Sequence, residues 1–366
     1  MNVLLCTGSL PPMRCGVGDY TMQLASALAR RCGLRVTVLT SMSAAGGEPP
    51  GDITVWPIVS RWNVASAFLV WRSIRRAAAD IVHVQYPTQG YGKGLLPSWI
   101  PLIARLAGAR VVQTWHEPVG PRSLVPRCLT QSEVVVVRAN FRDLLGTWSR
   151  RLLRTRVLHY VPGAAALPAS NLSQAHADSL RASYLKGASR LVVFLGFVYP
   201  HKGVELLFDI GDPARDHIVV AGQVMPDPGY EAVLRERASG AWEGKVTFVG
   251  FLEAAGAAAL LAAADAVVLP FRHGGGDWNS SIHAATINGA YVVTTARDKQ
   301  GYDAERNISY SPIDDVDSMR RALECCHERR GTCPPTGDAG WDFIASRHAE
   351  IYRASSRKPV GAEVAA

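Results

Sequence analysis

Short apolar runs rich in β-branched residues alternate with stretches of helical periodicity along the whole chain. In the first half these runs are Val3–Thr7, Arg35–Thr40, Ile53–Pro57, Ile81–Gln85, Val111–Trp115, Val134–Val137 and Val157–Val161. In the second half they are Leu191–Phe197, His217–Ala221, Lys245–Val249, Ala266–Pro270, Tyr291–Thr295 and Ile308–Tyr310. Continuous apolar runs of this length predict parallel strands that are covered on both faces of a sheet.

Helical periodicity fills the segments between the runs, as in Tyr20–Arg31. A last helix is predicted over Trp341–Ser355, where five residues share one helical face: Trp341, Ile344, His348, Ile351 and Tyr352. The alternation predicts an α/β fold with doubly wound sheets. Single cores stop growing at roughly 250–300 residues, so the 366 residues predict two domains. We expect Rossmann-like domains over residues 1–165 and 166–340 that face a central cleft, then a C-terminal helix over 341–356 and a disordered tail over 357–366.

Composition narrows the class of protein. With 48% hydrophobic and 19% charged residues, the chain can bury cores, and disorder is excluded for most of it. Its seven cysteines are irregularly spaced and include no C-x-x-C pair, which predicts neither a disulfide framework nor a zinc site. The start, Met1–Gly8, is typical of a first strand rather than a signal peptide, and no run of about 18 apolar residues predicts a membrane span. We therefore expect a cytoplasmic protein.

The net charge of +8 is unevenly distributed. Residues 1–165 hold 19 Lys and Arg against 7 Asp and Glu, a net charge of +12, whereas residues 166–366 hold 20 against 24, a net charge of −4. A basic half predicts an anionic partner, such as a membrane surface. Nucleic acid is disfavoured as that partner because no recognised nucleic-acid-binding motif accompanies the charge.

Basic and aromatic residues interleave within residues 60–80. The candidate membrane or acceptor face consists of Arg61, Trp62, Trp71, Arg72, Arg75 and Arg76. Arginines beside tryptophans are typical of an interfacial helix on anionic lipid. The alternative is an ordinary amphipathic helix that packs Phe68 and Trp71 into the domain. Both interpretations hold if one face of the helix is buried in the domain and the arginines on its rim contact lipid.

In the first half, two loops that follow predicted strands carry groups that could bind a ligand: backbone amides in one and polar side chains in the other. Gly16 and Gly18 precede a helix and would let backbone amides approach a phosphate, although an ordinary glycine loop is the alternative. A dinucleotide fingerprint is absent, because the third glycine and the acid after the second strand are missing, which disfavours a nicotinamide dehydrogenase.

His116 and Glu117 follow a strand and are expected to point into the cleft, unless His116 only caps its loop through backbone bonds. His83, inside a strand, is expected to be structural.

Two segments of the second half could bind an anion. Lys202 stands directly before a predicted helix start, where its charge and the helix dipole would suit a diphosphate. A solvated lysine is the alternative. Three glycines and then Asn279, Ser280 and Ser281 precede an Ala-rich helix, which resembles an anion cradle with Asn279 as N-cap. A flexible loop capped by Asn279 is the alternative.

The order of these motifs resembles the glycosyltransferase family 4 type of GT-B enzyme. The matching stretches are Pro11–Tyr20, Asp80–His83, Thr114–Glu117, Gly196–Gly203, Val246–Gly250, Ala263–Asp265 with Pro270, and Gly289–Thr295. The resemblance implies transfer of a sugar from a nucleotide-sugar donor, with retention and with no essential metal or cofactor. From the basic half and the arginine–tryptophan helix we expect the acceptor to be a lipid-linked, polysaccharide or other glycoside intermediate. It implies that the Gly16 amide lies against the donor diphosphate, that His116 lies near the transferred sugar and that Lys202 binds the diphosphate.

The chain departs from the family pattern at three positions. Phe197 stands where the family commonly has Arg, and Gly275 and His283 stand where it commonly has two glutamates. Ser280 and Ser281, with His283 and the backbone amides, are then the candidate donor contacts. The departures leave open a second hypothesis, a catalytically degenerate GT-B protein that acts as a binding or partner subunit. A third, an epimerase of GT-B fold, lacks evident acid and base carboxylates.

Overall fold

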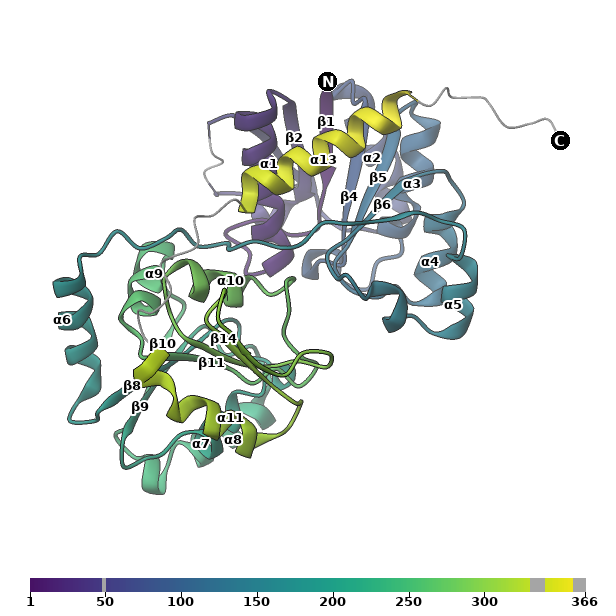
Figure 1. The fold of residues 1–366 in the computed structure, drawn as a ribbon. Coiled ribbons are helices and arrows are strands. Elements are labelled where there is room, and N and C mark those ends of the chain that lie inside the picture. The colour runs from purple at the N-terminus through teal and green to yellow at the C-terminus, as the bar shows by residue number, and fades with distance from the viewer. Residues whose placement is uncertain (48–50, 330–339, 358–366) are drawn as a thin grey trace. The chain divides into compact units, whose positions relative to one another are not determined.

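The computed structural model describes residues 1–47, 51–329 and 340–357. Two compact units divide the chain: the described residues up to Gly163 with helix α13 (Gly340–Arg357) form unit 1, and those from Ala164 to Arg329 form unit 2. Each unit is an α/β structure built on one sheet (Figure 1). The predicted fold class is confirmed within each unit. Residues 358–366 of the expected tail lie outside the described residues.

Unit 1 has a fully parallel seven-stranded sheet in the order β3-β2-β1-β4-β5-β6-β7. Its strands are β1 (Asn2–Cys6), β2 (Arg35–Ser41), β3 (Ile53–Val59), β4 (Ile81–Tyr86), β5 (Arg110–Trp115), β6 (Glu133–Val136) and β7 (Leu158–Tyr160). Besides α13, its helices are α1 (Gly16–Cys32), α2 (Ala67–Arg76), α3 (Leu96–Leu106), α4 (Pro121–Cys128) and α5 (Thr147–Leu152). Each apolar run predicted from the sequence forms a strand; the inner strands are largely buried, whereas the edge strands β3 and β7 are partly exposed.

Unit 2 has a seven-stranded sheet in the order β10-β9-β8-β11-β12-β14-β13. Its strands are β8 (Arg190–Leu195), β9 (Asp216–Ala221), β10 (Val246–Gly250), β11 (Ala266–Leu269), β12 (Val292–Thr295), β13 (Gly301–Asp303) and β14 (Ile308–Ser311). Its helices are α6 (Gln174–Leu185), α7 (Leu207–Ile210), α8 (Pro228–Arg237), α9 (Ala254–Ala263), α10 (Ser280–Ile287), α11 (Val316–Glu324) and α12 (Cys326–Arg329). The short edge strand β13, which pairs antiparallel with β14, was not predicted, because three residues with no apolar run give no strand pattern.

The last helix completes unit 1. Figure 1 shows α13 lying along α1, although the two are far apart in sequence. The predicted apolar face is buried: Trp341, Ile344, His348, Ile351 and Tyr352 are between 0% and 8% exposed. The helical spacing of these residues therefore predicted correctly which side of α13 is covered.

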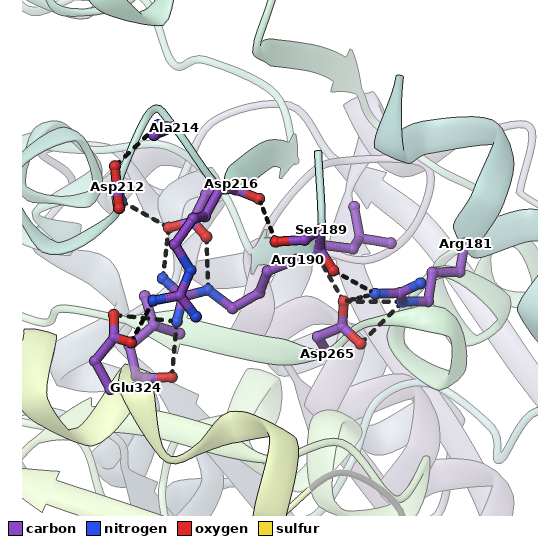
Figure 2. Close-up of polar contacts among 11 residues, drawn as sticks. Arg181, Ser189, Arg190, Asp212, Ala214, Asp216, Asp265 and Glu324 are labelled. Atoms are coloured by element: carbon purple, nitrogen blue, oxygen red, sulfur yellow. Dashed lines mark hydrogen bonds and ion pairs between the residues drawn. The ribbon is translucent and has the colours of Figure 1, made fainter. Parts of the chain in front are cut away.

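Buried ion pairs join the amino ends of three strands of unit 2 (Figure 2). Arg190, which opens β8, is fully buried and donates to both carboxylate oxygens of Asp216 at 2.5 and 2.8 Å. Asp265, just before β11, accepts from the Arg181 Nε at 2.9 Å and from the Leu191 amide at 2.7 Å. A buried charge that loses its partner is costly, so these pairs tie β8, β9 and β11 together at the edge away from the carboxyl ends.

Candidate functional site

The two predicted anion-binding loops of unit 2 pack against each other. They follow β8 and β11, which are neighbouring parallel strands, so both loops leave the same edge of the sheet. Gly203 has a φ of +68°, and a Cβ there would lie 2.3 Å from the Pro270 carbonyl oxygen. The Arg272 amide donates to the His201 carbonyl at 3.1 Å. Only glycine allows this approach, and it brings Lys202 next to the second loop.

Lys202 contributes positive charge at this edge. Its Nζ lies 4.5 Å from the centroid of the Phe271 ring. Lys202 closes one 3-10 turn (Pro200–Lys202), and the helical stretch predicted after it begins at Val204 as a second 3-10 turn (Val204–Leu206) that continues into the single turn of α7. So short a helix has little dipole. Any attraction for a diphosphate therefore comes from the ammonium group itself.

Arg272, on the neighbouring loop, is already neutralised. Its Nε donates to Glu205 at 3.0 Å, and its Nη1 donates to Asp314 at 2.9 Å. Tyr230 also hydrogen-bonds to Glu205. Arg272 is thus held in an ion-pair network that orders the two loops.

The start of α10 lies at the same edge. Asn279 does not act as the predicted N-cap, because its Oδ1 instead accepts from the Gly276 amide at 2.9 Å. The first amides of a helix have no intrahelical partner, so the Ser280 and Ser281 amides open α10 without a side-chain cap. Ser281 Oγ would be 3.3 Å from a Cβ on Gly196, which places it against the end of β8.

His283 lies one turn into α10, and its Nε2 donates to the Asp277 carbonyl at 2.9 Å. Asp277 in turn forms an ion pair with Arg306 at 2.5 Å. The imidazole therefore anchors the glycine loop of residues 274–278. Its predicted donor contact stays a prediction.

The glycine loop of unit 1 is uncapped at the beginning of α1. Gly16 is exposed and a Cβ there would meet nothing within 4 Å, whereas a Cβ on Gly18 would be 3.0 Å from the Ser9 carbonyl oxygen. Asp19, in the first turn, was not predicted as a site residue, and burial raises its pKa to about 6. Its place one residue after Gly18 was the only sequence signal.

His116 follows β5 and is 9% exposed. Its Nε2 hydrogen-bonds the Gln85 Oε1 at 2.9 Å, and the Tyr20 ring packs edge-on with its centroid 4.8 Å away. Burial lowers the pKa of His116 to about 3, so the imidazole is neutral. Loop capping through backbone bonds does not describe this side chain, which bonds to Gln85. Glu117 is bound by Arg138 at 2.7 and 2.9 Å.

His83 is structural, as predicted. It is fully buried in β4, where Nδ1 lies 2.6 Å from Tyr352 Oη and Nε2 lies 2.7 Å from Thr114 Oγ1. Gln85, two residues along the same strand, is also fully buried and touches both histidines. The sequence analysis did not identify Gln85, since nothing in the pattern of a buried strand marks one polar residue as a bridge.

Two family models match consecutive parts of the chain. One, a glycosyl transferase 4-like domain, covers residues 15–195, and the other, glycosyl transferases group 1, covers residues 189–328. The chain belongs to the glycosyltransferase family that these two models, 4-like and group 1, describe together. The predicted family is thereby confirmed, and the protein is a glycosyltransferase.

Solved structures share the glycosyltransferase's GT-B fold. HepE from Anabaena in complex with UDP is 15% identical over 97% of this chain and 98% of its own, with a TM-score of 0.68. Sucrose-phosphate synthase from Thermosynechococcus elongatus is 16% identical over 96% and 98%, with a TM-score of 0.68. WaaG, a glycosyltransferase involved in lipopolysaccharide biosynthesis, is 15% identical over 98% and 100%, with a TM-score of 0.62. No curated protein matches the sequence.

The predicted membrane face of the glycosyltransferase is largely exposed on unit 1. Arg61, Trp71, Arg72, Arg75 and Arg76 are exposed. Trp62 is a correction: it is 3% exposed and donates its indole N–H to Ser41 Oγ at 2.8 Å, so it belongs to the core.

Helix α2 carries most of this face. It buries Val70, Ser73 and Ile74, and leaves Phe68 65% and Trp71 37% exposed, with their rings stacked 5.7 Å apart. The alternative that these two aromatic residues pack into the domain is therefore wrong. In the described part of the chain, no helix has the length and apolarity to cross a bilayer.

Proposed function

We propose that this glycosyltransferase moves a sugar from a nucleotide-sugar donor to a hydroxyl of a lipid-linked, polysaccharide or other glycoside acceptor, with retention and without an essential metal. The observation that carries the proposal is the packing of Lys202 and the uncapped start of α10 at one strand edge of unit 2. A cation beside free helix amides is suited to a diphosphate. HepE, of the same fold, is described in complex with UDP and with UDP-glucose, which supports this donor class.

Sugar transfer requires that the departing diphosphate is stabilised. Breaking the anomeric C–O bond leaves positive charge on the sugar and negative charge on the diphosphate. The Lys202 ammonium and the Ser280 and Ser281 amides, which lie at one edge of the unit 2 sheet, would meet that negative charge. His116, whose Nε2 is bonded to Gln85, would contact the sugar through its other ring nitrogen.

Replacement of Lys202 tests the assignment. Lys202→Ala should lower turnover about 100-fold or more, the scale at which loss of one transition-state donor is felt, while Lys202→Arg should recover part of it. Lys245→Ala, at the amino end of β10 in the same unit, is the control and should leave turnover unchanged. Equal turnover in wild type and Lys202→Ala would reject the role of Lys202.

A degenerate binding subunit is the second candidate, favoured by Phe197, Gly275 and His283 at the positions of the family's charged residues. Thermal shift with UDP-, GDP- and TDP-sugars, paired with a transfer assay, separates the two. Stabilisation by a donor with turnover supports the enzyme. Failure of every donor to stabilise the protein or to be turned over supports the subunit.

We also propose that the exposed face of α2 contacts an anionic membrane surface, where a lipid-linked acceptor would be found. Phe68 and Trp71 offer apolar rings at the surface, Arg72 lies 6.0 Å from the centroid of the Phe68 ring, and Arg75 is exposed one turn after Trp71. Each basic residue near anionic lipid contributes about 1 kcal/mol. In flotation with phosphatidylglycerol vesicles, Arg72→Glu with Arg75→Glu should abolish binding, whereas Arg235→Glu with Arg321→Glu on unit 2 should not. If the wild-type protein does not bind the phosphatidylglycerol vesicles, the proposed membrane contact of α2 is refuted.

A further inference from the structure

A continuous chain of hydrogen bonds runs through unit 1 from α13 to His116. Tyr352 Oη lies 2.6 Å from His83 Nδ1, the Gln85 Nε2 lies 3.2 Å from His83 Nε2, and the Gln85 Oε1 lies 2.9 Å from His116 Nε2. Tyr352, His83 and Gln85 are each 0% exposed. Water therefore cannot replace these contacts, and His83 Nε2 is held by Thr114 Oγ1 at 2.7 Å as well as by Gln85.

The two ends of the Gln85 amide impose opposite roles on the two histidines. An amide oxygen only accepts, so His116 Nε2 must carry the proton of that bond. An amide nitrogen only donates, so His83 Nε2 must be the acceptor, and its proton is on Nδ1, facing Tyr352. Both histidines are neutral because burial lowers their pKa values.

We propose that Gln85 is the positioning residue that holds His116 in the neutral Nε2–H tautomer and presents Nδ1 as a hydrogen-bond acceptor for a hydroxyl group of the bound sugar. Within the described residues, His116 Nδ1 makes no side-chain or backbone hydrogen bond. The Tyr20 ring, set at 81° to the imidazole, limits its rotation from another side. The proposal rests on the proposed function, since it requires that a sugar reaches His116.

The arrangement assigns a task to helix α13 as well. Tyr352 contacts His83 across 269 residues of sequence and so anchors the far end of the chain of bonds. The Gln85 amide bonds a histidine through its nitrogen and another through its oxygen, and the side chain is closed to solvent. The orientation of His116 is therefore determined by residues of β4 and α13.

The tautomer can be measured without any substrate. In protein labelled with ¹⁵N-histidine, two-bond proton–nitrogen correlations distinguish an Nε2–H from an Nδ1–H imidazole, and the His116 signals are identified by their loss in His116→Gln. The proposal expects His116 protonated on Nε2 at pH 7.5. Protonation on Nδ1 would overturn it, whatever the activity of the enzyme.

Substitution of Gln85 tests the consequence for transfer. Gln85→Met keeps the length of the side chain but removes both hydrogen bonds, so the His116 signal should become a tautomer mixture and kcat should fall about tenfold or more with little change in donor KM. Ser98→Ala is the matched control: it removes a side-chain hydrogen bond of unit 1 outside this network, to Ser123 Oγ, and should keep kcat within about twofold.

The outcomes separate this proposal from the proposed function. If Gln85→Met disturbs folding, the wild-type tautomer still decides the assignment. An Nε2–H tautomer in wild type together with unchanged kcat in a folded Gln85→Met protein would overturn the positioning role. Absence of transfer by wild type with every donor would instead refute the proposed function and leave the tautomer result standing.

Discussion

Acid should loosen the docking of α13 on unit 1, and His348 should account for a defined share of the loss. The side chain is fully buried. Its Nδ1 donates to the Ile344 carbonyl at 2.8 Å, and Nε2 finds no partner among the described residues. Burial lowers the pKa of His348 from 6.5 to about 4. A proton on Nε2 would therefore create a cation with no hydrogen-bond acceptor, 5.4 Å from the His83 ring.

The direction and size of the effect follow from the two pKa values of His348. An opened α13 binds the proton with a pKa near 6.5 and the docked helix only near 4, so docking is favoured fully above pH 6.5 and weakens as the pH falls toward 4. One pKa unit corresponds to about 1.4 kcal/mol. At pH 5 the loss from His348 alone is therefore about 2 kcal/mol, an increase of about 30-fold in the opening equilibrium relative to pH 7.5.

Amide hydrogen exchange of α13 peptides, corrected for its intrinsic pH dependence, measures this opening. His348→Leu cannot be protonated, so the change in α13 opening free energy between pH 7.5 and pH 5 should shrink by about 2 kcal/mol relative to wild type. His327→Leu, an exposed histidine of unit 2, is the control and should leave the change as in wild type. An identical pH dependence in wild type and His348→Leu would refute the reasoning.

Two further substitutions should change stability in opposite directions. Asp216→Ala leaves the buried Arg190 with only Glu324, at 3.4 Å, as a carboxylate partner, so urea denaturation should show unit 2 destabilised by about 3 kcal/mol, and a loss below about 1 kcal/mol would contradict the importance of the Arg190–Asp216 pair. Asp19→Asn should stabilise unit 1 at pH 7.5 by about 1–2 kcal/mol, since the pKa of Asp19 is raised to about 6 and its charge is buried above that pH. The gain should fall as the pH drops below 6 and vanish only well below pH 3.8, where Asp19 is protonated in both states, and a gain that persists there would have another cause.

The sequence pattern predicted those features that depend on neighbours along the chain. Apolar runs located the strands, and helical spacing identified the buried face of α13, because burial imposes a repeat of its own on each kind of element. The order of the motifs identified the family. Each of these signals lies within a short stretch of sequence.

The sequence pattern did not predict contacts between distant segments. Trp62 looked like a surface tryptophan among arginines, but its indole reaches Ser41 at the end of β2. Asn279 looked like a helix cap, but the Gly276 amide competes for its oxygen. Gln85 and Asp216 were missed because their roles depend on which strands become neighbours. One stretch of sequence does not contain that information.

The most direct test of the central claim is the binding and turnover of nucleotide sugars. UDP-, GDP- and TDP-sugars should be screened by thermal shift, and the donor that stabilises the protein should be followed in a transfer assay with wild type and Lys202→Ala. The account predicts that at least one donor raises the melting temperature and is turned over, and that Lys202→Ala lowers kcat about 100-fold or more. Wild-type protein that is neither stabilised by nor active on any nucleotide sugar would contradict it.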